Sequence, residues 1–287
     1  MQAKPRNVKS TNVRLSQGAI RMAFRALGPV PSVASVLATK LWATPPRAPM
    51  RPEQRARLTE AERFDVDAAA TRVAAYAWGA GPSVLLAHGW GGHAGQLAAF
   101  VPGLVRAGHR VVAFDAPRHG ATTGGVPSLP AFGEAAKAVA AAVGGIDAVI
   151  GHSMGASAMA FAMRRGLEAR RAVFLAPAAT MSGAAERFAE MIHLDPRALE
   201  GMRRRTERMF DVRWEELDVV RDAPWMRSQL LVVHDEGDRD VPYEEGDAIV
   251  RAWPDSTLVT TRDLGHNRLL RDPEVVRRAV EFVTTRR

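Results

Sequence analysis

From Phe64 onward, short apolar runs alternate with longer, alanine-rich runs along most of the chain. The short runs have the length and composition of buried strands, and the longer runs have those of helices. A chain with this alternation folds into a mostly parallel sheet flanked by helices, so an α/β architecture is expected. The pattern predicts eight strands, at Phe64 to Asp67, Arg72 to Trp78, Ser83 to Ala87, Arg110 to Asp115, Ala148 to Gly151, Ala172 to Ala176, Gln229 to His234 and Thr257 to Thr261. Helices are predicted between them, at Gly95 to Ala107, Leu129 to Val143, Met154 to Arg165, Glu244 to Trp253 and Pro273 to Thr284.

One long insertion interrupts this alternation between the strands that end at Ala176 and begin at Gln229. The interval is far longer than the usual connection between a strand and a helix. It contains three amphipathic stretches with helical spacing, at Ser182 to Met191, Pro196 to Met209 and Trp214 to Val220. We therefore predict a small helical cap, inserted at about residues 178–225.

The net positive charge of the chain comes from its first 57 residues. The whole chain has a net charge of +8, but residues 1–57 hold eleven basic residues and one acidic residue, or +10. The other 230 residues hold 28 basic and 30 acidic residues, or −2. A nucleic-acid-binding module would carry a basic face on its folded body, so no nucleic-acid partner is expected.

The basic segment is predicted to be a helical extension, residues 1–57, that precedes the main domain at 58–287. Val13 to Leu27 is amphipathic, with Arg14, Arg21 and Arg25 on one face and apolar residues on another. A proline-rich piece from Pro45 to Pro52 then predicts an extended linker. Two hypotheses stay open for the helix: weak peripheral contact with an anionic membrane, or packing on the core with its arginines in water. In both, the charge affects docking or solubility, and the chemistry should not depend on it.

Composition limits the compartment and the chemistry. The chain has no cysteine, which excludes disulfides, thiolate metal ligands and a cysteine nucleophile. The longest stretch without charged residues, Val73 to Val105, is broken by many glycines and cannot span a membrane. The N-terminus lacks the compact apolar region of a signal peptide. A cytoplasmic protein is predicted.

The sharpest signal for chemistry is Gly151-His152-Ser153-Met154-Gly155. It follows a predicted strand and begins a predicted helix, which is the context of the G-x-S-x-G nucleophile elbow. In that turn the serine sits on a tight bend where neighbouring side chains would collide, so glycines flank it. Ser153 is therefore the candidate nucleophile.

A serine nucleophile needs a base, and the base needs an orienting acid. Downstream of Ser153 the histidines are His193 in the cap, His234 inside a strand, and His266. His266 follows the last strand, at the same sheet edge as Ser153, and is the candidate base. Asp238 is the candidate acid because Gly237 provides a turn that can aim it inward, with Asp235 and Asp240 as alternatives.

The negative charge that develops on an attacked carbonyl needs two hydrogen-bond donors. The backbone N–H groups of Met154, next to the nucleophile, and of Trp90, in the glycine-rich loop after the Ser83 to Ala87 strand, are the candidates. That loop lacks the following lysine and the G-x-G-x-x-G pattern of nucleotide sites. The remaining histidines lack metal-ligand spacing, so no cofactor and no metal are expected.

Taken together, the sequence resembles the α/β-hydrolase superfamily of esterases and lipases. The resemblance rests on five motifs in the family's order, over about 220 residues from Phe64: His88-Gly89, Asp115 to Gly120, Gly151 to Gly155, Gly237-Asp238 to Val241-Pro242, and Gly265-His266. It implies the hydrolase fold, the roles of Ser153, Asp238 and His266 as nucleophile, acid and base, and a lid at Ala178 to Trp225. Arg118 departs from the family pattern, which commonly has glycine there, and either alters that loop or brings a cation to the pocket mouth.

The activity expected from these residues is hydrolysis of a small-molecule carboxylic ester through an acyl-enzyme. A thioesterase or acyltransferase would use the same residues. A binding protein that keeps the fold without turnover is the alternative from another class.

Overall fold

The computed structural model describes residues 17–68 and 71–285, and Val13 and Arg14 of the predicted N-terminal helix lie outside these residues. Within them, eight strands form one sheet in the order β1-β2-β4-β3-β5-β6-β7-β8. β2 runs antiparallel to both neighbours, and the pairs from β4 to β8 are parallel. The strands are β1 (Glu62–Ala68), β2 (Thr71–Trp78), β3 (Ser83–Ala87), β4 (Arg110–Phe114), β5 (Ala148–His152), β6 (Arg171–Leu175), β7 (Gln229–Asp235) and β8 (Ser256–Thr261).

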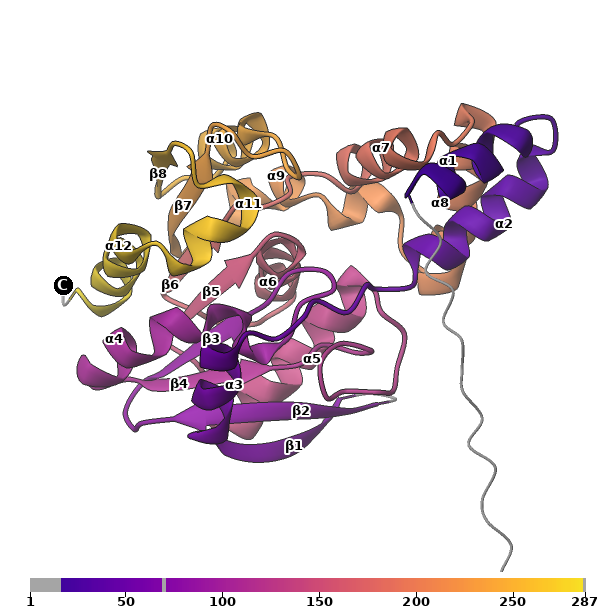
Figure 1. Ribbon diagram of the computed structural model, residues 1–287. Helices are drawn as coiled ribbons and strands as arrows, with labels where there is room; N and C mark the ends of the chain where they lie inside the picture. The colour runs from indigo at the N-terminus through magenta and orange to yellow at the C-terminus, as the bar shows by residue number, and fades with distance from the viewer. Residues whose placement is uncertain (1–16, 69–70, 286–287) are drawn as a thin grey trace, which may run out of the picture.

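Helices cover both faces of this sheet (Figure 1). Alternating side chains of the strands pack against the helices of one face or the other. In β3, Leu85 and Ala87 join the core under α5 and α6, whereas Val84 and Leu86 join the core under α4 and α12. The strands are therefore buried on both faces, which explains why they are continuous apolar runs. The covering helices are η1 (Ala94–Phe100), α4 (Val101–Arg106), α5 (Leu129–Ala142), α6 (Met154–Arg164), α10 (Tyr243–Ala252), α11 (Gly265–Arg268), η4 (Leu269–Arg271) and α12 (Pro273–Thr284).

The predicted architecture is confirmed: a mostly parallel eight-stranded sheet flanked by helices, with a helical cap and an N-terminal helical extension. Each predicted strand is present, with ends shifted by two residues at most. Asp272 accepts hydrogen bonds from the N–H groups of Glu274 and Val275, so α12 begins at the predicted aspartate-proline cap. No helix of the described residues is both long enough and apolar enough to cross a membrane.

The cap lies between β6 and β7 and projects beyond the carboxyl edge of the sheet (Figure 1). It consists of α7 (Met181–Ile192), α8 (Pro196–Phe210), η2 (Trp214–Leu217), α9 (Val219–Asp222) and η3 (Ala223–Trp225). Both long helices begin at side-chain caps, because the Thr180 hydroxyl accepts from Gly183 N–H and the Asp195 carboxylate accepts from Arg197 N–H.

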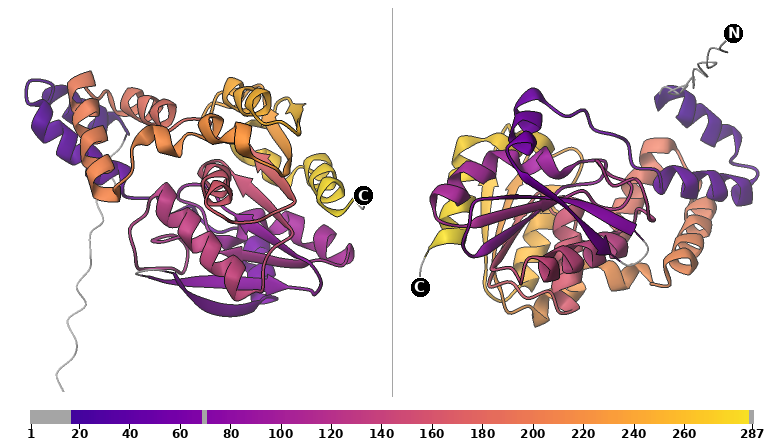
Figure 2. Two further views of the ribbon diagram at one scale, coloured as in Figure 1. Left: turned by 180° about the vertical axis from the view of Figure 1, so that it is seen from behind. Right: turned by 90° about the horizontal axis from the view of Figure 1, so that it is seen from below.

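The N-terminal extension differs from its prediction as a helix followed by a linker. It contains α1 (Gln17–Ala26), an unpredicted helix α2 (Pro31–Trp42), and α3 (Pro52–Thr59) after an extended stretch. α1 packs on α7 and α2 packs on α8, and all views of the ribbon place the four helices together (Figures 1 and 2). The sequence pattern missed α2 because its buried side chains include Ser35 and Thr39, whose hydroxyls donate to backbone carbonyls one helical turn earlier.

Candidate active site

Ser153 lies at the junction of β5 and α6 with a backbone φ of +51°. Positive φ is strained for a residue with a side chain, and such strain is common at functional sites. The flanking glycines are required by close contacts: a Cβ at Gly151 would lie 2.6 Å from the Cα of Ala156, and one at Gly155 would lie 2.2 Å from the carbonyl oxygen of His88. The elbow geometry expected from the sequence is therefore present.

The structure brings His266 and Asp238 into direct contact. His266 Nδ1–H donates to Asp238 Oδ2 at 2.7 Å, and the Asp238 side chain is fully buried. Burial by itself raises the pKa of Asp238, but hydrogen bonds from His234 and His266 outweigh it and hold the pKa well below its ordinary value. Asp238 is thus a carboxylate at neutral pH, and it fixes the protonated nitrogen of His266 as Nδ1. His266 lies in the short helix α11 instead of a loop.

The two alternative acids occupy other positions. The Asp235 carboxylate accepts from Gly237 N–H, Leu264 N–H and the Thr261 hydroxyl, so it ties the β7 and β8 loops together behind His266. Burial by itself raises the pKa of Asp235, but these hydrogen bonds lower the pKa by more than burial raises it, so the net shift is downward. Asp240 is exposed at the rim of the cavity.

Two buried histidines, which the sequence analysis did not assign, support this arrangement. His234 Nε2–H donates to the Val241 carbonyl at 3.0 Å and lies 3.5 Å from Asp238 Oδ2. His152 Nε2–H donates to the backbone carbonyl of His266 at 3.0 Å, and the two rings are 4.6 Å apart. Burial, together with the neighbouring His266, lowers the pKa of His152 to about 3, so it is neutral. Adjacency to Ser153 was the sequence signal that could have identified His152.

Trp90 and Met154, whose N–H groups are the two predicted oxyanion donors, line the same cavity as Ser153. Met154 is the first residue of α6, so its N–H has no partner within the helix. In the loop after β3, the Gly89 carbonyl accepts from His88 Nδ1–H at 2.7 Å and from Gly92 N–H at 3.0 Å. In a trans peptide the next N–H, that of Trp90, points the opposite way. This geometry is compatible with the predicted role of Trp90 and Met154, which stays a prediction.

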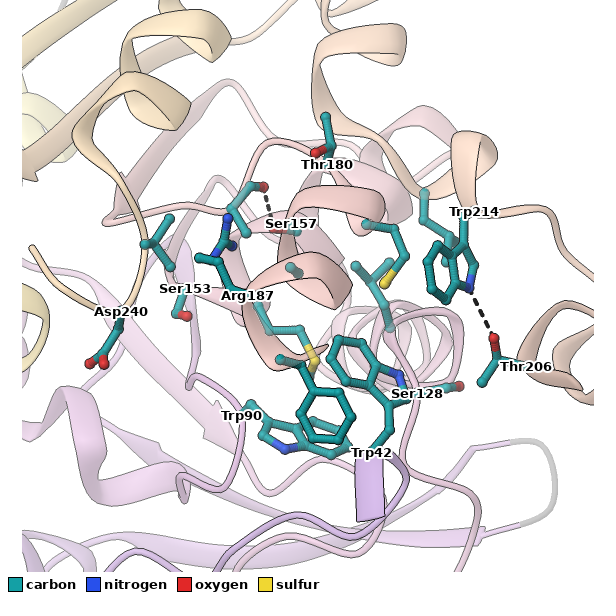
Figure 3. Close-up of a pocket in the computed structure, with 18 of the residues that line it drawn as sticks. Trp42, Trp90, Ser128, Ser153, Ser157, Thr180, Arg187, Thr206, Trp214 and Asp240 are labelled. Atoms are coloured by element: carbon teal, nitrogen blue, oxygen red, sulfur yellow. Dashed lines mark hydrogen bonds between the residues drawn. The ribbon is translucent and has the colours of Figure 1, made fainter. Parts of the chain in front are cut away.

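Ser153, His266, Trp90 and Met154 line one cavity of about 760 Å³ between the sheet edge and the cap (Figure 3). This volume is typical of small-molecule sites. Two lining residues come from the N-terminal extension, Arg21 of α1 and Trp42 of α2. The sequence predicted an extension that precedes the main domain, and the structure shows that two of its residues line the same cavity as Ser153. Arg118 is exposed with φ of +62° and is not part of the cavity lining.

Ligand atoms of Asp238, Asp240 and His266 lie within 4.8 Å of one another, which is close enough for a metal ion. However, the Asp238 and His266 atoms already form a 2.7 Å hydrogen bond, and Asp240 is exposed. These atoms therefore serve to orient the imidazole of His266. No other feature of the described residues points to a metal ion at this position.

Comparisons with known proteins agree with this geometry. A protein-family model described as the alpha/beta hydrolase family matches residues 84–279. Similar solved structures include an esterase from Pyrococcus furiosus (TM-score 0.65, 19% identity, covering 83% of this chain and 98% of that one) and an esterase from Exiguobacterium antarcticum (TM-score 0.61, 15% identity, 78% and 100%). A thermophilic esterase from Thermogutta terrifontis is also similar (TM-score 0.58, 20% identity, 78% and 100%). At these identities the likeness shows the fold alone. No curated protein matches the chain significantly.

Proposed function

The chain belongs to the alpha/beta hydrolase family, and we propose that it is a serine hydrolase that cleaves carboxylic esters through an acyl-enzyme. The observation that carries the proposal is one cavity lined by both Ser153 on its elbow and His266, whose Nδ1 is bonded to the buried Asp238. The similar solved structures of esterases share the fold and support the proposal of the same class of activity.

In the proposed reaction, Ser153 Oγ attacks the ester carbonyl carbon while His266 Nε2 accepts the hydroxyl proton. The carbonyl oxygen becomes an oxyanion that the N–H groups of Trp90 and Met154 stabilise. The C–O bond to the alcohol then breaks, His266 returns the proton to the leaving oxygen, and the acyl group stays on Ser153. Water attacks this ester in the same way, with His266 as base, and releases the acid.

Asp238 has a positioning and electrostatic role in this scheme. Its carboxylate holds the imidazole in the tautomer that leaves Nε2 free to accept a proton, and it stabilises the imidazolium that forms. His152 holds the backbone of His266 from the other side. Both contacts keep the base in position before substrate binds.

The proposal is tested with a chromogenic short-chain ester and a fluorophosphonate probe on wild type, Ser153→Ala and Ser32→Ala. Ser32 is exposed on α2 and lies outside the cavity, so it is the matched control. Wild type and Ser32→Ala should give a burst of product and label with the probe, and Ser153→Ala should do neither. A wild type that neither turns over nor labels would leave the alternative of a binding protein with a hydrolase fold.

A thioesterase or acyltransferase remains the second candidate, because it would form the same acyl-enzyme and differ only in the substrate or in the acceptor. Adding alcohols or thiols to the ester assay distinguishes them. An acyltransferase would pass the acyl group to the added acceptor faster than to water, and a thioesterase would prefer acyl thioesters over oxygen esters.

We also propose weak contact of the N-terminal helices with anionic membranes. Val33 and Leu37 are exposed on one face of α2, and Met22 is exposed on α1, in a segment of net charge +10. Arg21 and Arg25 instead turn toward α7, where Arg21 Nε–H donates to the Met191 carbonyl and Arg25 approaches His193. Sedimentation with phosphatidylserine vesicles should be weaker for Val33→Asp/Leu37→Asp than for wild type, and equal binding would refute the contact.

A further inference from the structure

The cavity that holds Ser153 is closed on one side by the N-terminal extension. Trp42, the last residue of α2, and Arg21 of α1 line it together with residues of the sheet edge and the cap. Figure 3 shows Ser153 and Trp214 on opposite sides of the cavity, with Trp42 and Trp90 along the edge between them. A residue more than one hundred positions before the nucleophile thus forms part of the wall that a bound substrate would meet.

The extension is firmly attached to the cap, so this wall is a fixed feature. The Trp42 ring lies edge-on to Phe188 of α7, with 5.0 Å between centroids. Phe24, Ala34 and Ala38 are buried among α7 and α8 residues in a separate apolar cluster. α2 approaches α8 so closely that a Cβ at Gly201 would lie 2.8 Å from the Cβ of Ser35. Burial of this apolar surface stabilises the contact between the extension and the cap.

Several polar side chains in the interior of the cavity already form hydrogen bonds within the protein. The Thr206 hydroxyl accepts from Trp214 Nε1–H and donates to backbone, and the Ser157 hydroxyl donates to the Ala178 carbonyl. The Thr180 and Ser128 hydroxyls accept from backbone N–H groups at helix starts, and the Arg187 guanidinium pairs with Glu245 through Nη1. A polar group buried against such walls would lose its bonds to water without replacement.

The remaining interior surface is apolar and largely aromatic, with Trp42, Met181, Phe188, Phe210, Trp214 and Leu217 among its residues. Charged side chains that line the cavity and are exposed stand at its edge: Arg21, Glu190, Arg239 and Asp240. An apolar interior with a charged rim suits a ligand that has its reacting ester at Ser153 and a long apolar group directed along the wall.

We infer that Trp42 is a specificity-determining residue and that the substrate is an ester with a long apolar chain, which packs against the wall formed by α2 and the cap. The inference rests on the proposed ester hydrolysis. The long apolar chain of the substrate belongs to either the acyl part or the alcohol part of the ester, and in either position it would make the same apolar contacts with the wall. The basic extension is then part of the substrate site and sets the chain length that the enzyme prefers.

The test compares kcat/KM for two-carbon and eight-carbon esters in two arms: p-nitrophenyl acetate against octanoate for the acyl part, and ethyl against octyl acetate for the alcohol part. Wild type should prefer the eight-carbon ester in one arm. In that arm Trp42→Ala should lower kcat/KM for the long ester about tenfold or more and leave the short ester within about twofold. Trp42→Phe, which keeps an aromatic ring at this position, should be intermediate.

Trp225→Ala is the matched control, because Trp225 is exposed on η3 and lies outside the cavity lining. This variant should leave kcat/KM for both the short and the long ester unchanged. The inference is overturned if wild type shows no chain-length preference in either arm. It is also overturned if Trp42→Ala lowers kcat/KM equally for the short and the long ester, or lowers it for neither. Fluorophosphonate labelling of each variant separates the two hypotheses: labelling of Ser153 with an unchanged chain-length ratio overturns only the role of Trp42, whereas failure of wild type to label or turn over overturns the proposed function.

Discussion

Replacing Asp238 by asparagine removes one charge and keeps the shape, and the surrounding hydrogen bonds decide how the new amide is oriented. Oδ1 of Asp238 accepts from the N–H groups of Asp240 and Val241 at 2.8 and 3.0 Å, and Oδ2 faces His266 Nδ1 at 2.7 Å. The amide oxygen will keep the two backbone bonds. The amide NH₂ then points at His266, which must present an unprotonated Nδ1 and carry its proton on Nε2. In that tautomer His266 cannot accept the proton of Ser153.

The size of the effect follows from the cost of the opposite orientation. Turning the amide over would leave two backbone N–H groups without partners, at roughly 1–3 kcal/mol each, or about 2–6 kcal/mol together. At about 1.4 kcal/mol for each factor of ten, the productive orientation falls to between about one part in 30 and one in 10⁴. Loss of the charge that stabilises the imidazolium adds to this, so a drop in kcat of about 10⁴ is expected, as in other serine triads.

The assay is kcat and kcat/KM with a chromogenic ester, together with the rate of fluorophosphonate labelling. Glu236→Gln, in the same loop, is the control, because it removes one exposed carboxylate that pairs with Arg262; it should stay within about twofold of wild type. If Asp238→Asn retains more than a tenth of wild-type activity, or falls no further than Glu236→Gln, the tautomer argument is wrong. Asp235→Asn and Asp240→Asn would then be compared to find the acid.

Two further predictions concern the elbow and the buried histidine behind it. Gly155→Ala should lower the free energy of unfolding by about 3 kcal/mol or more and abolish labelling, because its Cβ would overlap the carbonyls of His88 and Ala87; a urea midpoint near that of wild type would contradict the contact. His152 is neutral in the folded state, with its pKa lowered to about 3, while the unfolded chain binds a proton below about 6.5. Its contribution is therefore fully present above pH 6.5 and is lost as the pH falls toward 3, by about 2 kcal/mol between pH 7 and pH 5. His152→Gln should lose this part of the slope in denaturation measured across that range, and an unchanged slope would show that His152 does not titrate in this way.

Much of the sheet and the candidate catalytic residues could be predicted from the sequence, because local sequence patterns determine them. Alternation of β-type and helical runs locates the strands, since buried parallel strands are continuous apolar runs. Gly151 and Gly155 identify the elbow because the backbone there excludes any Cβ. Ser153, Asp238 and His266 each follow a strand of the parallel part of the sheet, so they meet at one edge.

The sequence by itself determined the fold class, through the alternation of strand and helix patterns along the chain, and it identified the candidate nucleophile and the candidate base, because each lies in a short motif that follows a predicted strand. The turn at Gly237 favoured Asp238 as the acid, but only the tertiary structure decided that Asp238, and not Asp235 or Asp240, faces His266, since this depends on how the loop after β7 folds against the residues after β8. It also decided that Trp42 reaches the cavity. That contact joins α2 to a cap more than one hundred residues later, and it depends on the packing of two apolar helix faces, which no local pattern encodes.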